Sequence, residues 1–462
     1  MQKVHQSNVL DLEQRPVTSL LWKYFVPAFT GVILNSLYNV VARIFIGHGV
    51  GALALSGLSA VFPIMIIMMA FGMLIGMGAG VRISIALGKK DYALADRVLG
   101  NAFVLTVIVS AIIMLIGFWV KDPILHFFGV GAETYKYATE YLDIILLGTV
   151  FNVVGFSLNN LIRSEGNART AMFSMMISAG TNLLLDPLLI FVFDMGVAGA
   201  AWSTVISQAL LTIWVIWHFR SKRSIVKLHA RHFKLDGKII WYIISVGFAP
   251  FSMQLASSVV QGVFNMQLAK FEGDLAIGAM GIINSVIIFL VMSVIAINMA
   301  AQPIIGFNYG ARNYSRVKQT LVLCIKAATA ICVVGFITVQ LFPGFMIKIF
   351  NNNSPGLLEI GTQGIRLILL ALPFVGFQII VGNFFQSTGK AGIAALLSMM
   401  RQVIMLLPFL FVFPNFWGIK GVWYSAPVAD TLSALIVSYF LWHEIKWLNV
   451  HIRYANRHAS VS

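Results

Sequence analysis

The stretch AVFPIMIIMMAFGMLIG, residues 60–76, decides the fold class of this chain. It contains no charged residue, and its apolar side chains do not alternate with polar ones as they would in a strand of a membrane barrel. A helix needs about 20 mostly apolar residues to cross a bilayer. The stretch lies inside a longer apolar segment, residues 58–87, which therefore predicts one membrane-spanning helix.

Segments of the same kind recur along all 462 residues, of which 59% are hydrophobic and only 11% charged. A soluble protein has roughly a quarter charged residues, so this chain has too few to cover a surface that faces water. We therefore predict an all-α polytopic membrane protein with twelve transmembrane helices. The twelve segments are residues 21–46, 58–87, 98–120, 137–162, 171–194, 197–219, 240–269, 276–306, 321–347, 360–386, 392–416 and 418–445.

The 32 lysines and arginines predict the orientation of these helices. If the N-terminus is inside the cell, inside segments hold 23 of them and outside segments hold 6. The remaining three, Lys326, Arg366 and Arg401, lie within spans. Because inside loops of membrane proteins are enriched in basic residues, this bias predicts that both termini are cytoplasmic. The net charge of +15 then serves topology and contact with anionic lipids, not binding to nucleic acid.

The longest basic break, FRSKRSIVKLHARHFKLDGK at residues 219–238, divides the spans into six and six. Segments of the first half recur about 222 residues later in the same order: ALGKKDYALADRV (86–98) as NYGARNYSRVKQT (308–320), RSEGNA (163–168) as QSTGKA (386–391), and GVAGAAWS (196–203) as GIKGVWYS (418–425). An even number of spans inserts both halves in the same orientation, an arrangement found in secondary transporters. A central cavity between the halves, open to one side at a time, is the expected consequence.

This division predicts five parts: a cytoplasmic tail at 1–20, a first lobe at 21–219, a basic linker at 220–239, a second lobe at 240–445 and a second cytoplasmic tail at 446–462. The first tail is polar and lacks the short apolar core and cleavage site of a signal peptide.

Asp186 is the best candidate for a functional residue, because an ionisable group within a span is costly and usually functional. Asn182 lies four residues earlier and therefore on the same helix face. Pro187 has no N–H, which frees the carbonyl of Leu183. These groups could hold a small hard cation such as Na⁺, or the carboxyl could take up a proton, since low-polarity surroundings favour its neutral form. The alternative is a helix-kinking Asp-Pro pair whose carboxyl binds a neighbouring helix.

Longer motifs carry a resemblance to a known family. LNNLIRSEGNARTAM (158–172) and TNLLLDPLLIFVFDMGVAGAAWSTVISQ (181–208) resemble the first half of the multidrug and toxic compound extrusion (MATE) family. GMGAGVRISIALGKKDYALADRV (76–98) and AQPIIGFNYGARNYSRV (301–317) resemble its paired loops after the second and eighth spans. The resemblance covers essentially the whole chain, and the bacterial branch with MepA-like multidrug pumps fits best.

The resemblance implies a V-shaped pair of six-helix lobes in a prokaryotic inner membrane. It also implies export of amphipathic cationic drugs or toxins by a monomer, driven by inward movement of Na⁺ or H⁺ without another cofactor. Family members place a threonine of the sixth span and a tyrosine of the fourth span against the fifth-span carboxylate. By motif spacing these are Thr204 and Tyr141, and Asn182 and Asp186 match the family's cation residues directly.

The phrase YNVVARIFIG, residues 38–47, departs from the family in one respect. MATE relatives usually carry an aspartate in the first span at the position of Ala42. Arg43 needs no acid because it can reach the outer interface. Tyr38 and Asn39 remain as polar lining one turn away. The departure predicts that ion coupling rests on Asp186 alone.

The spans of the second half carry neutral amides and one acid, Asp430. The amides suit either a substrate cavity or hydrogen bonds between helices. Asp430 is expected to pair with Arg401 or Arg366, as a structural ion pair or with a role in gating or substrate contact. The candidates for the substrate cavity are Tyr38, Asn39, Ala42, Gln261, Asn265, Gln378 and Asp430.

No catalytic motif competes with transport. The chain has no phosphate-binding loop ending in Gly-Lys-Ser/Thr, no His-Glu-x-x-His pair and no Gly-x-Ser-x-Gly nucleophile, so neither ATP-driven transport nor an enzyme is expected. The alternative function is a flippase for lipid-linked precursors of the same superfamily. Such a protein needs several basic residues facing an anionic headgroup, and few arginines lie within the spans here.

Overall fold

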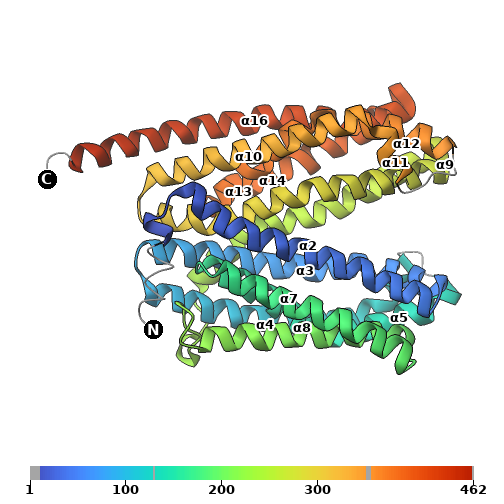
Figure 1. Ribbon diagram of the computed structural model, residues 1–462, viewed down its shortest axis with the longest axis horizontal. Coiled ribbons are helices and arrows are strands. Elements are labelled where there is room, and N and C mark those ends of the chain that lie inside the picture. Colours follow the sequence, from blue (N-terminus) through green and yellow to red (C-terminus); the bar gives the residue numbers. More distant parts are fainter. Residues whose placement is uncertain (1–10, 128–130, 350–354, 460–462) are drawn as a thin grey trace. The chain divides into compact units, whose positions relative to one another are not determined.

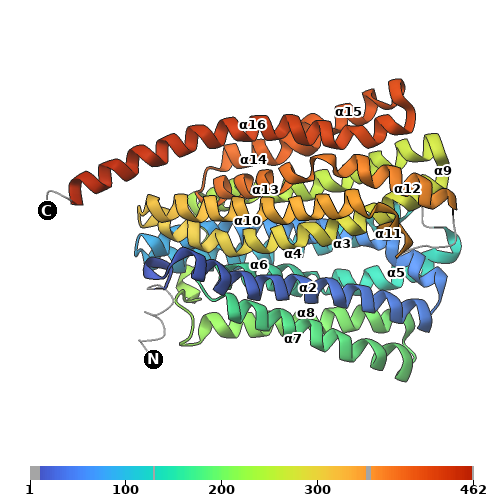
Figure 2. The same ribbon diagram turned by 45° about the horizontal axis from the view of Figure 1, so that its top comes forward.

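The computed structural model describes residues 11–127, 131–349 and 355–459, and no strand occurs among them (Figure 1). The helices of the first half are α2 (Val17–Gly49), α3 (Ala52–Gly88), α4 (Tyr92–Phe127), α5 (Ala132–Leu147), α6 (Thr149–Ser164), α7 (Ala168–Pro187), the π-helix η1 (Leu188–Val192) and α8 (Gly196–Arg220). The short 3-10 helix η2 (Ala230–His232) lies in the linker, and α9 (Gly237–Gly310) follows it. In two views α7 and α8 lie side by side (Figures 1 and 2).

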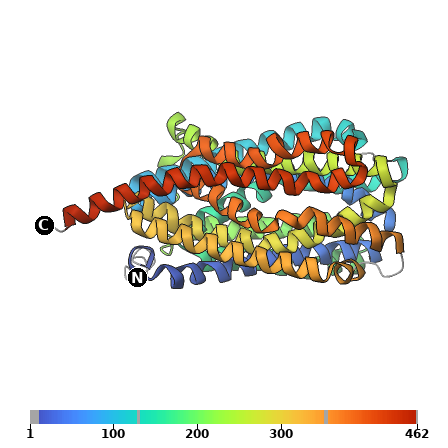
Figure 3. The same cartoon turned by 90° about the horizontal axis from the view of Figure 1, so that it is seen from above.

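The second half continues from α9 with a similar series of helices. They are α10 (Tyr314–Leu341), α11 (Pro343–Lys348), α12 (Pro355–Ile368), the 3-10 helix η3 (Leu369–Ala371), α13 (Leu372–Ser387), α14 (Ala391–Met399), the π-helix η4 (Met400–Leu406), α15 (Leu407–Val412) and α16 (Pro414–Ala459). The end of α16 continues past the other helices of this half (Figure 3).

The spans expected from the sequence are present in the described part of the chain. Eleven helices are long and apolar enough to cross a membrane, and the bent pair Glu133–Leu147 and Thr149–Ser164 can form a twelfth span. The helix α9 supplies two of them, Gly237–Phe271 and Gly278–Gly310. The all-α, polytopic fold class is therefore confirmed.

The chain forms two compact units that follow its two halves. Unit 1 comprises Met1–Arg15 and Trp22–Phe251, and unit 2 comprises Pro16–Leu21 and Ser252–Ser462. The main division between the two units lies inside α9, between Phe251 and Ser252.

The start of α9 belongs to unit 1 because it packs directly on the backbone of α3. A Cβ atom on Gly78 would lie 2.0 Å from the carbonyl oxygen of Ile243, and one on Gly247 would lie 1.7 Å from that of Leu74. Only glycine permits backbones to approach this closely. The Arg82 guanidinium also stands 4.5 Å from the centre of the Tyr242 ring.

Candidate functional site

Asp186 lies where the fifth span changes its helical geometry. Pro187 ends α7, and the π-helix η1 begins at the next residue, with the Phe193 N–H donating to the Leu188 carbonyl at 3.0 Å. A proline cannot donate the backbone hydrogen bond that would continue the α-helix, and π-helical turns often occur at functional sites. Gly199 of α8 lies against this turn, since a Cβ there would be 2.8 Å from the Leu189 carbonyl oxygen.

Asn182, Asp186 and Ser203 form a buried polar cluster between α7 and α8. The Asn182 amide nitrogen donates to Ser203 Oγ at 2.9 Å and lies 3.5 Å from Asp186 Oδ1. The Ser203 hydroxyl donates to the Asn182 carbonyl oxygen at 3.2 Å and also lies close to the Asp186 carboxyl. All three residues are at most 2% exposed.

Two oxygens of this cluster lack a hydrogen-bond partner among the residues that the structure describes. They are Oδ2 of Asp186 and Oδ1 of Asn182. A buried hydrogen-bond acceptor without a partner lowers the free energy of unfolding, and a buried carboxylate without a counter-charge lowers it further. Oxygen ligands suit hard cations, and the carboxyl can take up a proton instead. The cluster therefore fits a small monovalent cation or a proton.

The predicted partners Tyr141 and Thr204 meet in the same region of unit 1. The Thr204 hydroxyl donates to the Ala200 carbonyl oxygen at 3.0 Å and lies close to the Tyr141 phenol. The phenol also lies within electrostatic range of Tyr38, Asp186 and Arg43. The hydroxyl that contacts Asp186 itself is that of Ser203, the neighbour of Thr204. Successive residues point about 100° apart around a helix, so motif spacing alone did not identify this contact.

The remaining first-span candidates lie on α2. Ala42 and Tyr38 are half-buried, and the side chain of Asn39 lies outside the described residues. Arg43 is exposed, and its guanidinium stands 4.9 Å from the centre of the Phe62 ring. A cation over an aromatic face is stabilised without an acid, which accounts for the lone arginine of this segment.

In unit 2, two of the predicted amides are hydrogen-bonded to each other. The Gln261 amide nitrogen lies 3.1 Å from Asn265 Oδ1, and Asn284 donates to Gln261 Oε1 at 2.8 Å. These residues hold the two spans of α9 together, as expected for hydrogen bonds between helices.

Asp430 on α16 forms the ion pair that the sequence left open between two arginines. Its Oδ1 lies 2.5 Å from Nε of Arg401, which lies on η4. Arg366 instead contacts the Gln340 backbone oxygen at 3.4 Å. The predicted cavity residue Gln378 donates to the backbone oxygen of Asp430 at 2.8 Å.

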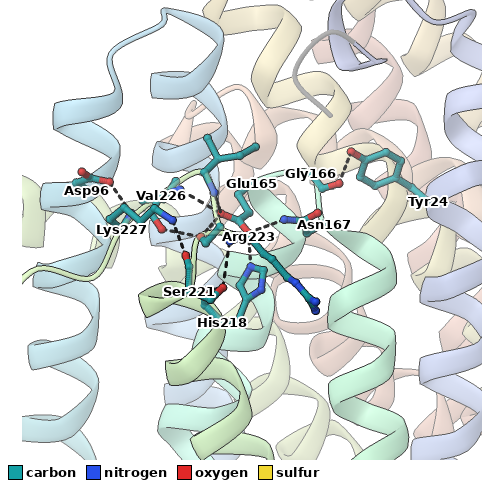
Figure 4. Close-up of polar contacts among 12 residues, drawn as sticks. Tyr24, Asp96, Glu165, Gly166, Asn167, His218, Ser221, Arg223, Val226 and Lys227 are labelled. Carbon is teal, nitrogen blue, oxygen red and sulfur yellow. Dashed lines mark hydrogen bonds and ion pairs between the residues drawn. The ribbon is translucent and has the colours of Figure 1, made fainter. Parts of the chain in front are cut away.

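Another buried acid, Glu165, was not singled out from the sequence. It follows α6 and is 0% exposed. Its carboxylate lies 2.6 Å from His218 Nε2 and accepts hydrogen bonds from Asn167 and Ser224, as Figure 4 shows. The backbone N–H groups of Ile225 and Val226 also donate to it, at 3.1 and 3.2 Å.

These contacts fix the ionisation of Glu165 and the position of the linker. Burial alone would raise the pKa of its carboxyl, but the His218, Ser224 and Asn167 contacts outweigh burial and lower it. Since Ser224 to Val226 belong to the linker, the carboxylate attaches that segment to unit 1. The only sequence signal was one acid in a loop between spans, with a histidine at the end of the sixth span.

Comparison with known proteins agrees with this architecture. The MatE family model matches residues 27–188 and again residues 251–412, a shift close to the repeat seen in the sequence. The multidrug export protein MepA of Staphylococcus haemolyticus is 28% identical over 430 residues, which is 93% of this chain and 94% of that protein. MepA of Staphylococcus aureus strain N315 is 28% identical over 92% of this chain and 93% of its own length.

Solved structures extend the comparison to the fold. The MATE multidrug transporter DinF-BH, solved in complex with a ligand, superposes with a TM-score of 0.87 at 36% identity, covering 93% of this chain and 97% of that chain. A MATE protein in a bent conformation gives a TM-score of 0.90 at 22% identity, covering 97% and 99% of the two chains.

Proposed function

The chain belongs to the MatE family of multidrug efflux transporters, and we propose that it exports amphipathic organic cations by antiport with Na⁺ or H⁺. One observation supports ion coupling above all. Asp186 and Asn182, within about one helical turn of each other in a membrane span, each carry an oxygen that has no hydrogen-bond partner in the described part of the chain. A cation or proton would satisfy them, and its release would leave the carboxylate uncompensated.

The ion gradient supplies the energy for transport, and this difference between the ion-bound and ion-free carboxyl links the gradient to the conformational change. Asp186 binds the cation or proton on one side of the membrane and releases it on the other. The change of charge on a buried carboxyl is large enough to bias an alternating-access equilibrium, because a buried uncompensated charge is costly. Substrate and coupling ion then bind in alternation. The Asn182 amide and the Ser203 hydroxyl orient the carboxyl for this exchange.

The names of the relatives support the proposed substrate class. The MepA proteins are named for multidrug export, and DinF-BH is described as a multidrug transporter. We extend to this chain a preference for amphipathic cationic drugs or toxins, with membrane lipid around the monomer. The proposed location is a prokaryotic inner membrane with both termini in the cytoplasm. Neither ATP nor another cofactor enters this scheme.

One feature of unit 2 weakens the flippase alternative. A flippase for anionic lipid-linked precursors requires basic side chains that are free to contact a phosphate. The guanidinium of Arg401 is instead held by Asp430 at 2.5 Å. An exporter of cations has no need of a free arginine there.

The test uses inverted membrane vesicles loaded under an imposed Na⁺ gradient or an imposed pH gradient, with ethidium accumulation as the readout. Wild-type protein is expected to respond to one of the two gradients, and Asp186→Asn is expected to respond to neither. The matched control is Asp91→Asn, because Asp91 is an exposed aspartate of unit 1 that lies between two spans and accepts a hydrogen bond from the Leu94 N–H at 2.9 Å. An asparagine side chain can accept the same hydrogen bond, so this variant should retain transport. Gradient-driven transport by Asp186→Asn would refute the mechanism.

A further inference from the structure

The Arg401–Asp430 pair is a charged site within the membrane spans of unit 2. Asp430 is 4% exposed, and three segments reach it: η4 through Arg401, α13 through Gln378, and α16, on which it lies. The Cys332 thiol of α10 also lies within electrostatic range of Arg401. A thiol is uncharged near neutral pH, so the guanidinium and the carboxylate balance each other.

The π-helix η4, which carries Arg401, is itself anchored to α9. Arg401 and Gln402 are consecutive residues of η4, and Gln402 exchanges hydrogen bonds with Ser257 of α9 at 3.0 and 3.1 Å. The neighbouring amide thus fixes the turn from which the guanidinium reaches Asp430. Each half of the chain carries a π-helix in its fifth span: η1 directly after Asp186 in the first half, and η4 around Arg401 in the second half.

The two buried aspartates differ in one respect. Asp186 has one oxygen without a partner in the described part of the chain, and its cluster contains no cationic side chain. Asp430 has a guanidinium 2.5 Å from its carboxylate. In unit 1 the counter-charge must come from solution, whereas in unit 2 the chain supplies it.

We propose that Arg401 is a tethered counter-cation that occupies the place beside Asp430 that a free monovalent cation or proton would otherwise take. Asp430 is therefore a masked cation-binding carboxylate, and Arg401 is the residue that confines ion coupling to unit 1. The masking rests on the geometry of unit 2, and its consequence for transport rests on the proposed antiport.

Removing the Arg401 guanidinium leaves the Asp430 carboxylate without its counter-charge. A buried carboxylate that loses its partner is strongly destabilising unless it is neutralised. In Arg401→Gln, the Asp430 carboxyl must therefore take up a proton or a cation from solution. In Arg401→Lys the positive charge remains, and this variant is the matched control.

The test measures labelling of Asp430 by dicyclohexylcarbodiimide, which reacts with protonated carboxyl groups in membrane proteins. Purified protein in lipid nanodiscs is labelled near neutral pH, digested and quantified by mass spectrometry. Labelling of Asp430 is expected to rise about tenfold or more in Arg401→Gln over wild type, the change that one pKa unit produces. Arg401→Lys should stay near wild type. Protection of Arg401→Gln by added Na⁺ would identify the ion as the occupant in place of the proton.

Equal labelling of Asp430 in wild type and in folded Arg401→Gln would overturn the proposal. A single sharp peak of the variant protein in size-exclusion chromatography, together with unchanged labelling of Asp186, establishes that the variant is folded. The double variant Arg401→Gln with Asp430→Asn tests the same idea without a buried charge, and neutral replacements of ion pairs are usually tolerated. It should keep wild-type ion dependence of efflux, and loss of that dependence would also overturn the proposal. If wild type shows no gradient-driven efflux at all, the proposed antiport fails while the labelling result stands.

Discussion

The Asn182 amide nitrogen lies 3.5 Å from Asp186 Oδ1 and 2.9 Å from Ser203 Oγ, so one amide joins the carboxyl of α7 to a hydroxyl of α8. The contact within α7 is a consequence of helical spacing. The contact with α8 exists only because Gly199 lets that helix approach η1 closely. The cluster thus combines a local pair with one residue that packing adds.

Ser203→Ala should weaken binding of the coupling ion. The variant removes the hydroxyl that holds the Asn182 amide beside the Asp186 carboxyl, a loss of about 1 kcal/mol or roughly fivefold in affinity. The measurement is the concentration of the coupling ion that gives half-maximal efflux. Ser207→Ala is the control, because the Ser207 hydroxyl donates only to the Ser203 backbone oxygen at 2.7 Å. An unchanged half-saturating concentration in Ser203→Ala would remove Ser203 from the site.

Ala42→Asp should increase ion-driven efflux. The variant adds a carboxylate where the resemblance to the MATE family leads us to expect one, and its oxygens are further ligands for the cation. Initial rates of efflux under a fixed ion gradient measure the effect. Ala42→Asn matches the size of the aspartate without its charge and should not increase the rate. If neither variant raises it, the chain couples without a first-span site.

Glu165→Gln should lower the free energy of unfolding by about 2–4 kcal/mol at neutral pH, because a buried, multiply hydrogen-bonded carboxylate loses its charge. Thermal unfolding followed by a thiol-reactive dye or by light scattering measures the effect. Glu140→Gln, on an exposed part of α5, should change it by less than about 0.5 kcal/mol. A Glu165→Gln variant as stable as wild type would show that the carboxylate does not hold the linker.

The difference in the free energy of unfolding between wild type and Glu165→Gln should shrink as the pH falls. The folded-state pKa of Glu165 is lowered from its ordinary value of 4.5. The ionised carboxyl of Glu165 therefore contributes its full stabilisation of the folded protein above the ordinary pKa. That stabilisation is lost as the pH falls through the folded-state pKa. Unfolding measured between neutral and strongly acidic pH should show the two proteins converging only below about pH 4.5. Convergence at a higher pH would contradict the lowered pKa.

Gly247→Ala should prevent normal assembly of unit 1. The added Cβ would lie 1.7 Å from the Leu74 carbonyl oxygen, so α9 must move away from α3. Overpacking of this kind typically costs about 1–3 kcal/mol and sometimes more. Gly262→Ala is the control on the same helix, since a Cβ there meets nothing within 4 Å. Yield of folded protein and thermal stability distinguish the two, and equal behaviour would contradict the close approach.

The sequence by itself determined the class of fold and one half of the candidate ion site. Apolar length predicted the spans, the repeat predicted two similar halves, and spacing placed Asn182 and Asp186 on one face. These features depend on residues close together in the chain, where helical geometry leaves little freedom.

Tertiary structure alone decided which distant groups meet. Asp430 pairs with Arg401 and not with Arg366, and Ser203 lies close to Asp186. His218 and Ser224 of the linker contact Glu165. Tertiary structure also placed the start of α9 against α3, because Gly78 and Gly247 let the two backbones approach closely. Such pairings depend on how helices approach and rotate against each other, and single-chain periodicity does not specify either.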